Sequence, residues 1–227
     1  MPDSIIFCTA GKRCQLQPEI DTLEAKIDEL NNLVSTDTLT GLSNYRHFTH
    51  MISREVERSG RTGQPTTLII IDVDHFKKVN DTWGHEVGNQ AIKLIATSIV
   101  KSIRQLDIAC RYGGEEFVVI FPSTDINTSV KAAERIRAAI ENSPLIIQLG
   151  DTKKPVQHTL TVSIGVSSYL GRLNNDGWHK LVERADNKLY EAKHNGRNQV
   201  CFSDTEADQH QVSEEEKLAL SNIFNNE

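Results

Sequence analysis

Long apolar runs are missing from this 227-residue chain. The longest strongly apolar run covers only Leu68–Ile71, whereas a membrane-spanning helix needs about 18 or more apolar residues. The same run is too short for the core of a signal peptide. We therefore expect a cytoplasmic protein without a membrane span of its own.

Cysteine is also scarce. The four cysteines, at positions 8, 14, 110 and 201, form no Cys-x-x-Cys pair, and no paired histidines accompany them at zinc-site spacing. The eight histidines show no ligand spacing of their own. We expect reduced thiols and neither a zinc site nor a disulfide framework.

An excess of positive charge is lacking as well. The chain has 25 Lys and Arg against 31 Asp and Glu, which gives a formal net charge of −6. Non-specific nucleic-acid binding depends on basic surface, so we expect no nucleic-acid partner. A small nucleotide is not excluded, because a metal ion and a few Lys or Arg side chains can neutralise its phosphates locally.

The chain divides into four predicted parts. Residues 1–18 show no period and indicate an irregular arm, and residues 204–227 form an acidic tail. Residues 19–35 predict a short amphipathic helix with a heptad seam at Ile20, Leu23, Ile27, Leu30 and Val34. Two interpretations remain open for this helix: it packs on its own domain, or it forms a parallel dimer stem. The main domain is predicted over residues 36–203.

Hydrophobic periodicity predicts an α+β main domain. We predict helices over residues 45–59, 87–106, 127–142 and 178–195, and strands over 66–73, 108–112, 117–121, 158–168 and 199–202. Residues 74–84 are predicted to be a connection. The order strand, helix, hairpin, helix, strand favours an antiparallel-rich central sheet with flanking helices on one face, in a ferredoxin-like or nucleotidyl-cyclase-like arrangement.

Carboxylates gather at two predicted strand ends. Glu115 and Glu116 follow the glycine pair of the hairpin, and Asp72 lies at the end of the central strand. Because neighbouring side chains of a strand point to opposite faces, only one of Glu115 and Glu116 is expected to face a given ligand. Asp72 and Glu115 would form an all-oxygen site for Mg²⁺, or Mn²⁺ in its place, with one ion or the pair common in phosphoryl transfer. Acids that merely end a strand are the alternative.

Six motifs occur in an order that resembles the GGDEF domain of diguanylate cyclases, in its GGEEF form. The motifs are Asp37-Thr-Leu-Thr-Gly-Leu42, Ile71-Asp-Val-Asp-His-Phe-Lys77 with Asn80-Asp81, Gly84-His85-x-x-Gly88, Arg111-Tyr-Gly-Gly-Glu-Glu-Phe117, Thr161-Val-Ser-Ile-Gly165, and Ala185-Asp-x-x-Leu-Tyr-x-Ala-Lys193-x-x-Gly-Arg-Asn198. The resemblance implies a homodimeric enzyme that condenses two GTP molecules into cyclic di-GMP and releases pyrophosphate.

The resemblance also implies roles for single residues. Asp72, Glu115 and Glu116 would be catalytic, and the metal would be held by Asp72, Glu115 and the Val73 carbonyl. The substrate would be bound by Phe76, Lys77, Asn80, Asn89, Gly114, Lys193 and Arg197. Lys193 and Arg197 are four apart, so we expect them on one helix face with both reaching one phosphate tail. Taken without the resemblance, this pair indicates only a solvated helix end.

An inhibitory product site is implied at Arg104-Gln-Leu-Asp107, together with Arg135. An arginine can bind phosphate or guanine through its planar guanidinium, and an aspartate can accept hydrogen bonds from a guanine edge. Cyclic di-GMP would bind there as inhibitor. An Arg-x-x-Asp motif without this context is a common accident.

Asn89 departs from the family pattern, which has Asp at this position. An amide both accepts and donates hydrogen bonds, so Asn89 either replaces Asp in guanine binding or weakens the discrimination of GTP from ATP. Three alternative functions stay open: a non-catalytic cyclic di-GMP receptor, a cyclase of relaxed nucleotide specificity, and an interaction module assembled through the heptad helix.

Overall fold

The computed structural model describes residues 20–23, 26, 35–148, 154–171 and 177–203. The chain separates into two units, residues 1–35 and 36–227. In the first unit, residues 20–23 and 26 are helical. The predicted arm, the rest of the heptad seam and the acidic tail lie outside the described residues. None of the described helices is long and apolar enough to cross a membrane.

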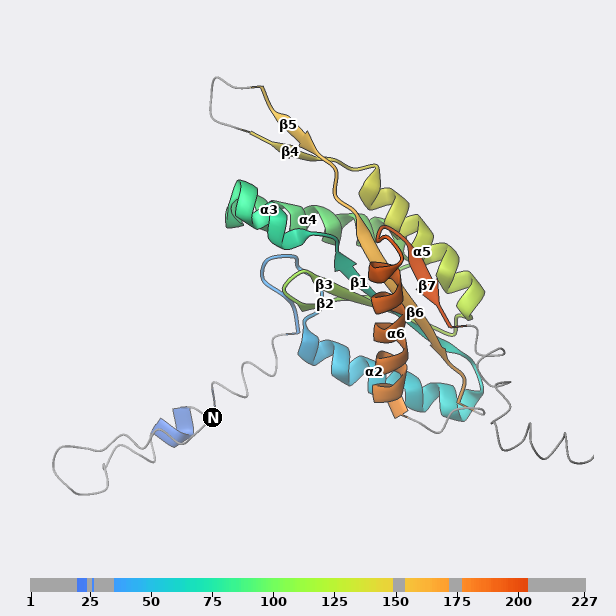
Figure 1. The fold of residues 1–227 in the computed structure, drawn as a ribbon. Helices are drawn as coiled ribbons and strands as arrows, with labels where there is room; N and C mark the ends of the chain where they lie inside the picture. The colour runs from blue at the N-terminus through green and yellow to red at the C-terminus, as the bar shows by residue number, and fades with distance from the viewer. Residues whose placement is uncertain (1–19, 24–25, 27–34, 149–153, 172–176, 204–227) are drawn as a thin grey trace, which may run out of the picture. The chain divides into compact units, whose positions relative to one another are not determined.

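A five-stranded sheet with the strand order β2-β3-β1-β6-β7 forms the centre of the second unit (Figure 1). Its strands are β1 (Thr66–Val73), β2 (Ile108–Gly113), β3 (Glu116–Pro122), β6 (Val162–Tyr169) and β7 (Val200–Phe202). Strand β1 pairs antiparallel with both β3 and β6, and only β7 runs parallel to its neighbour. This confirms the predicted α+β fold with an antiparallel-rich sheet.

Helices cover both faces of this sheet, so the expectation of helices on one face is wrong. Alternate residues of β1 belong to separate cores: Ile69 and Ile71 pack with α4 (His85–Ser102) and α5 (Ile126–Glu141). Leu68 and Ile70 pack with α2 (Tyr45–Thr62) and α6 (Gly177–His194). The physical reason is that β1 is apolar at successive positions, and a strand of this kind must be buried on both faces.

Three further elements differ from prediction. Helix α3 (Phe76–Trp83) occupies the predicted connection, because Phe76, Val79 and Trp83 repeat at helical spacing and contact the core. A separate two-stranded sheet, β4 (Leu145–Ile147) with β5 (Val156–His158), was not predicted. Three-residue strands are too short to show alternation. Helix α4 ends at Ser102, because the next residue, Ile103, has an extended backbone. The predicted helix over residues 87–106 was therefore too long at its C-terminal end.

Gly165 lets α6 approach the sheet closely. A Cβ atom at this position would lie 2.1 Å from the carbonyl oxygen of Ala185 and 2.3 Å from the amide nitrogen of Leu189. Both atoms are helix backbone and cannot move aside. The close contact brings the end of α6, which carries Lys193, to the end of β1.

Substituting Asp125 by alanine is expected to lower the free energy of unfolding by about 1 kcal/mol at pH 7. Asp125 is the N-cap of α5, and its side chain accepts hydrogen bonds from the Thr128 amide at 2.8 Å and the Thr128 hydroxyl at 3.0 Å. These bonds lower the pKa of Asp125. The stabilisation is therefore present above the ordinary pKa of 3.8 and is lost as the pH falls through the lowered value.

Urea unfolding of the parent and the variant between pH 7 and pH 3 measures this difference. Asp125→Asn is the control, because an amide oxygen still caps the helix without titrating. If Asp125→Ala lowers the free energy of unfolding by the same amount at every pH, the Asp125 cap is not ionised and the assignment is contradicted.

Candidate active site

Asp72 and Glu116 lie directly opposite each other on the paired strands β1 and β3. Both belong to the sheet face covered by α2 and α6, because they share the alternation of Ile70 and Val118. The antiparallel pairing thus brings the end of the central strand beside the glycine turn, as the sequence predicted. We call this end of the sheet, with residues 72–74 and 114–116, the carboxylate edge.

Strand alternation does not separate Glu115 from Glu116. Strand β3 begins at Glu116, and Glu115 belongs to the turn that follows Gly114, whose φ is 47°. The charge of Glu115 acts on both Asp72 and Glu116 and raises the pKa of each. The alternation rule therefore does not apply to Glu115, and the expectation that only one of the two glutamates faces a given ligand stays a prediction.

Lys193 is the cation that pairs with Asp72. Its Nζ lies 2.8 Å from Asp72 Oδ2, and the two side chains are 31% and 14% exposed. Burial is the largest cause that raises the pKa of Asp72, with smaller contributions from the charges of Glu115 and Asp74, and Lys193 only partly opposes them. Burial and the charge of Asp72 raise the pKa of Glu116 as well. At the carboxylate edge, Lys193 therefore does not balance the negative charge of the neighbouring carboxylates.

The donor atoms at the carboxylate edge suit a hard divalent cation. Carboxylate oxygens are preferred by Mg²⁺, which binds through one or two protein carboxylates and completes its shell with water and substrate phosphates. Within the described part of the chain, no group of three or more His, Cys, Asp or Glu side chains forms a complete metal cage. Asp72 and Glu115 supply donor atoms of the type that such an ion prefers.

Arg197 does not share a helix face with Lys193, which corrects the expectation from their spacing. Helix α6 ends at His194, and Arg197 lies beyond it with a left-handed φ of 63°. Gly196, with φ of 110°, ends the helical path before Arg197 is reached. The two cations therefore come from a helix end and from the segment that follows it.

Arg111 ties the glycine turn to the start of the domain. Its guanidinium donates to the Gly114 carbonyl oxygen from Nε at 3.0 Å and from Nη2 at 2.8 Å. Its Nη1 lies 3.2 Å from Asp37 Oδ2. Asp37 in turn accepts hydrogen bonds from the amide and hydroxyl of Thr40. Both Arg111 and Asp37 stand in the quoted motifs, but no site role was predicted for either.

Asp74 is a second residue whose role was missed. Its buried carboxylate accepts hydrogen bonds from the hydroxyls of Thr161 at 2.8 Å and Ser163 at 2.7 Å, and from the Asn198 amide at 3.0 Å. Asp74 therefore joins β1, β6 and the segment after α6. Hydrogen-bond donors from two other segments of the chain thus surround the Asp74 carboxylate.

Two of the residues predicted to bind the substrate, Phe76 and Asn80, lie against Gly88, where α3 packs on α4. A Cβ atom on Gly88 would lie 1.9 Å from Asn80 Oδ1 and 3.3 Å from the Phe76 ring. Gly88 thus leaves the space that the Asn80 side chain occupies. Asn89 is exposed beside it, and Lys77 is exposed in the first turn of α3. The structure brings Asn80 and Phe76 together with Gly88 and leaves Lys77 facing solvent.

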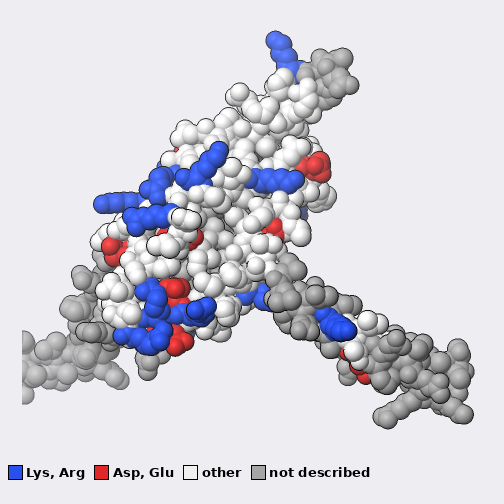
Figure 2. All heavy atoms as spheres, turned by 180° about the vertical axis from the view of Figure 1, so that it is seen from behind, with Lys and Arg blue, Asp and Glu red and all other residues white. Residues whose placement is uncertain are grey.

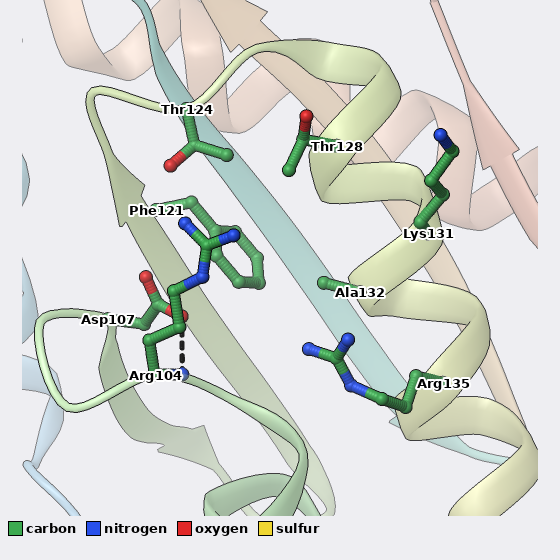
Figure 3. A pocket seen from close by; sticks show the side chains of 8 residues that line it. All are labelled: Arg104, Asp107, Phe121, Thr124, Thr128, Lys131, Ala132 and Arg135. Carbon is green, nitrogen blue, oxygen red and sulfur yellow. Dashed lines mark hydrogen bonds between the residues drawn. The ribbon is translucent and has the colours of Figure 1, made fainter.

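A pocket of about 230 Å³ contains the predicted inhibitory residues. Figure 3 shows the side chains that line it, which are Arg104, Asp107, Phe121, Thr124, Thr128, Lys131, Ala132 and Arg135. Asp107 accepts a hydrogen bond from the Arg104 amide at 2.7 Å. Arg135 donates to the Ser102 carbonyl oxygen at 2.6 and 2.9 Å. Tertiary structure thus places Arg104, Asp107 and Arg135 around one hollow.

Comparison with known proteins identifies relatives of this chain. The family model described as "Diguanylate cyclase, GGDEF domain" matches residues 34–199. The response regulator PleD of Caulobacter vibrioides is 41% identical over 180 residues, which are 79% of this chain and 38% of PleD. The diguanylate cyclase DosC of Escherichia coli K12 is 36% identical over 167 residues, which are 74% of this chain and 35% of DosC. The chain spans less than two-fifths of the length of either relative.

Solved structures give the same result. The coiled coil and GGDEF domain of DgcB from Caulobacter crescentus, in complex with c-di-GMP, matches with a TM-score of 0.69 and 31% identity over 82% of this chain and 94% of that chain. The active GGEEF domain of a diguanylate cyclase from Vibrio cholerae matches with a TM-score of 0.63 and 30% identity, over 71% of this chain and 97% of that chain. By sequence and by fold, this chain belongs to the GGDEF domain family of diguanylate cyclases.

Proposed function

We propose that residues 36–203 form a catalytic diguanylate cyclase domain that condenses two GTP molecules into cyclic di-GMP and two pyrophosphates. The observation that carries this proposal is the carboxylate edge, where Asp72 lies opposite Glu116, beside Glu115, and pairs with Lys193. Degenerate domains that only bind nucleotide do not need these charged groups, whose burial is costly.

The proposed reaction joins two half-sites in a homodimer. The 3′-oxygen of each GTP attacks the α-phosphorus of the other, a new P–O bond forms, and the bond from the α-phosphorus to the bridging oxygen breaks to release pyrophosphate. Bound Mg²⁺ would stabilise charge on the phosphates and on the attacking oxygen. Glu116, which lies opposite Asp72, would be the second acid near the attacking hydroxyl and would accept its proton.

Other residues would orient GTP. Asn80 and Asn89 would contact the guanine edge, and the backbone amides around His75, Phe76 and Lys77, at the start of α3, would face the phosphates. Arg197 would bind the β- and γ-phosphates. Lys193 would exchange its contact with Asp72 for phosphate once a metal ion neutralises that carboxylate. In this way the chain positions charged groups before reaction.

Dimerisation is proposed to depend on residues 19–35. The predicted heptad seam lies before the domain, and the DgcB structure likewise combines a coiled coil with a GGDEF domain. A parallel pair of such helices would hold two domains close enough to face each other. This supports the dimer-stem interpretation over packing of the helix on its own domain.

The pocket of Arg104, Asp107 and Arg135 is proposed to bind cyclic di-GMP as an inhibitor. Figure 2 shows Lys and Arg side chains gathered on the face opposite to the view of Figure 1. Arg104, Lys131 and Arg135 add exposed positive charge to the pocket although the whole chain is acidic. Local cations can therefore bind the two phosphates of the product.

Incubation of the purified chain with GTP and Mg²⁺ tests the proposed activity, with products separated by chromatography and weighed by mass spectrometry. Two parallel reactions are run: one with Mn²⁺ in place of Mg²⁺, and one with the Glu115→Ala variant in place of the parent. Cyclic di-GMP from the parent alone supports the proposal. No product at any protein concentration, together with retained cyclic di-GMP binding, would instead establish a receptor.

A further inference from the structure

The segment after α6 has an unusual backbone. Arg197 and Asn198 both adopt left-handed conformations, with φ of 63° and 45°. Successive left-handed residues with side chains are unfavourable, and such a conformation persists only where the surroundings hold it. Something must therefore hold this segment in place.

Asn198 supplies the contacts that do so. Its amide donates to Asp74 Oδ2 at 3.0 Å. Its side-chain Nδ2 donates to Glu141 Oε1 at 2.8 Å, and its Oδ1 accepts from Arg137 Nη1 at 2.9 Å. Arg137 is itself fixed by Glu141 at 2.8 Å. Asn198 thus connects the end of β1 with the last turns of α5, and every polar group of its side chain is used.

Arg197, the preceding residue, has no comparable support. It is exposed, and among the described residues no hydrogen bond or ion pair engages its guanidinium. The point at which its side chain leaves the backbone is therefore determined by the contacts on either side of it. That backbone is held on one side by the Arg197 amide, which donates to the Ala192 carbonyl oxygen at 3.0 Å, and on the other side by Asn198.

We propose that Asn198, held by Arg137 and Glu141, is a positioning residue that directs Arg197 toward the β- and γ-phosphates of the nucleotide. This inference rests on the proposed function, because it assumes that Arg197 binds the phosphate tail. It goes further in assigning α5 a part in substrate binding. A cation on a backbone segment that is already fixed loses less conformational entropy on binding than a cation on a mobile segment.

Asn198→Gly tests the proposal. Glycine keeps the left-handed backbone and the amide that donates to Asp74, and it removes only the two side-chain bonds to α5. The affinity for a GTP analogue with an uncleavable methylene link between the α- and β-phosphates, measured by calorimetry with Mg²⁺, is expected to fall about tenfold. The affinity for GMP, which lacks those phosphates, is expected to stay unchanged.

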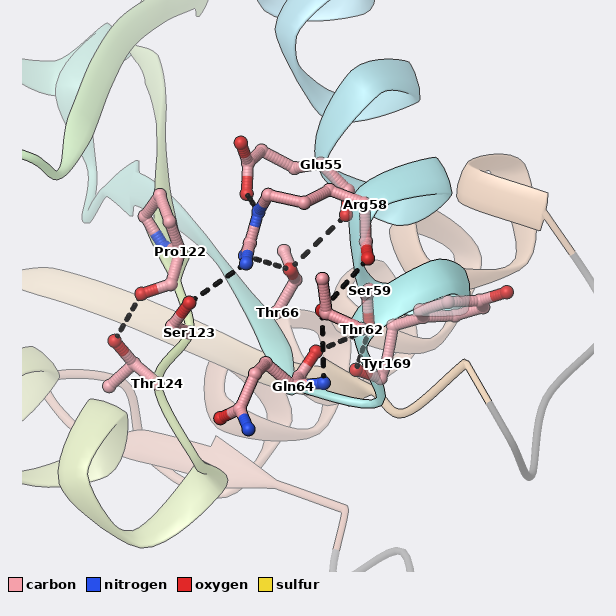
Figure 4. A network of polar contacts seen from close by, with 10 residues as sticks. All are labelled: Glu55, Arg58, Ser59, Thr62, Gln64, Thr66, Pro122, Ser123, Thr124 and Tyr169. Carbon is pink, nitrogen blue, oxygen red and sulfur yellow. Dashed lines mark hydrogen bonds and ion pairs between the residues drawn. The ribbon is translucent and has the colours of Figure 1, made fainter.

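Ser123→Gly is the matched control at the other end of the sheet. Ser123 also has a positive φ, of 49°, and its hydroxyl accepts a hydrogen bond from Arg58 Nη1 at 2.8 Å, within the network of Figure 4. Pro122, which precedes it, pairs with Thr66 at the start of β1, six positions from Asp72 and therefore roughly 20 Å away. This variant is expected to bind both nucleotides like the parent.

A double-mutant cycle shows whether Asn198 acts through Arg197. Arg197→Ala should lower the affinity for the analogue, and adding Asn198→Gly to it should lower it no further. Additive effects, or equal losses for the analogue and GMP, would overturn the proposal and leave Asn198 a purely structural residue. Glu141→Ala, a substitution at the surface end of α5, should reproduce the loss if Asn198→Gly folds poorly.

The outcomes separate this inference from the proposed activity. A parent that binds the analogue but makes no cyclic di-GMP refutes the activity and leaves the binding test intact. A parent that makes cyclic di-GMP, with an Asn198→Gly variant that binds the analogue as Ser123→Gly does, refutes only the inference. A parent that neither binds the analogue nor makes cyclic di-GMP refutes both.

Discussion

Replacing Asp72 with asparagine is expected to lower cyclic di-GMP synthesis by about 1000-fold, the size of effect that follows loss of a charged group acting on the transition state. Asparagine has nearly the same shape, and its amide oxygen can still accept the hydrogen bond from Lys193. The variant therefore loses the negative charge and little else. Initial rates at saturating GTP and Mg²⁺, compared with the parent, measure the effect.

A thermal-unfolding experiment connects this loss to the metal. A ligand that binds only the folded state raises the unfolding temperature, so Mg²⁺ with the uncleavable GTP analogue should stabilise the parent much more than Asp72→Asn. Asp125→Asn is the matched control, because it makes the same chemical change at the far end of the sheet, where Asp125 caps α5. Activity of Asp72→Asn within tenfold of the parent would contradict the assignment of Asp72 as a metal ligand.

Arg104→Ala is expected to raise the concentration of cyclic di-GMP that halves the activity by about 100-fold, because two charge-assisted hydrogen bonds to phosphate are lost. The uninhibited rate should change little. This is because the pocket lies away from the carboxylate edge. The pocket reaches Phe121, which pairs with Thr67 near the start of β1, whereas Asp72 lies at the other end of β1, opposite Glu116. Initial rates over a series of added cyclic di-GMP concentrations measure both quantities.

Lys101→Ala is the control for Arg104→Ala, since Lys101 is an exposed cation at the end of α4 that does not line the pocket. Arg104 is a better position to substitute than Asp107, because the Asp107 carboxylate also stabilises the turn by accepting a hydrogen bond from the Arg104 amide. Unchanged inhibition of Arg104→Ala, or an equal change in Lys101→Ala, would show that the product binds elsewhere.

The sheet and the carboxylate edge were predictable because their signals are local. The run Thr66–Val73 is β-branched and apolar and ends in Asp72 and Asp74, and the glycine pair before Glu115 indicates a hairpin. Adjacent strands in one sheet then leave few ways to place Asp72 except beside the turn. The six ordered motifs predicted the family, and the comparisons confirm it.

Other predictions failed where a short signal competed with tertiary packing. The eight-residue helix α3 was taken for a connection, because the Asp74–Gly84 segment has too few turns for its period to be clear. The four-residue spacing of Lys193 and Arg197 predicted one helix face, but Gly196 ends the helical path first.

The sequence by itself determined the α+β class, the carboxylates at the strand ends, and membership of the GGDEF family, since each depends on residue type at short spacing. Only the tertiary structure decided how those groups are supported. Arg111 reaches Asp37 across 74 positions of the chain, and Asn198 reaches Asp74 across 124. Such contacts leave no periodic pattern in the sequence, because they depend on how the strands and helices pack and not on any local preference of the residues that make them.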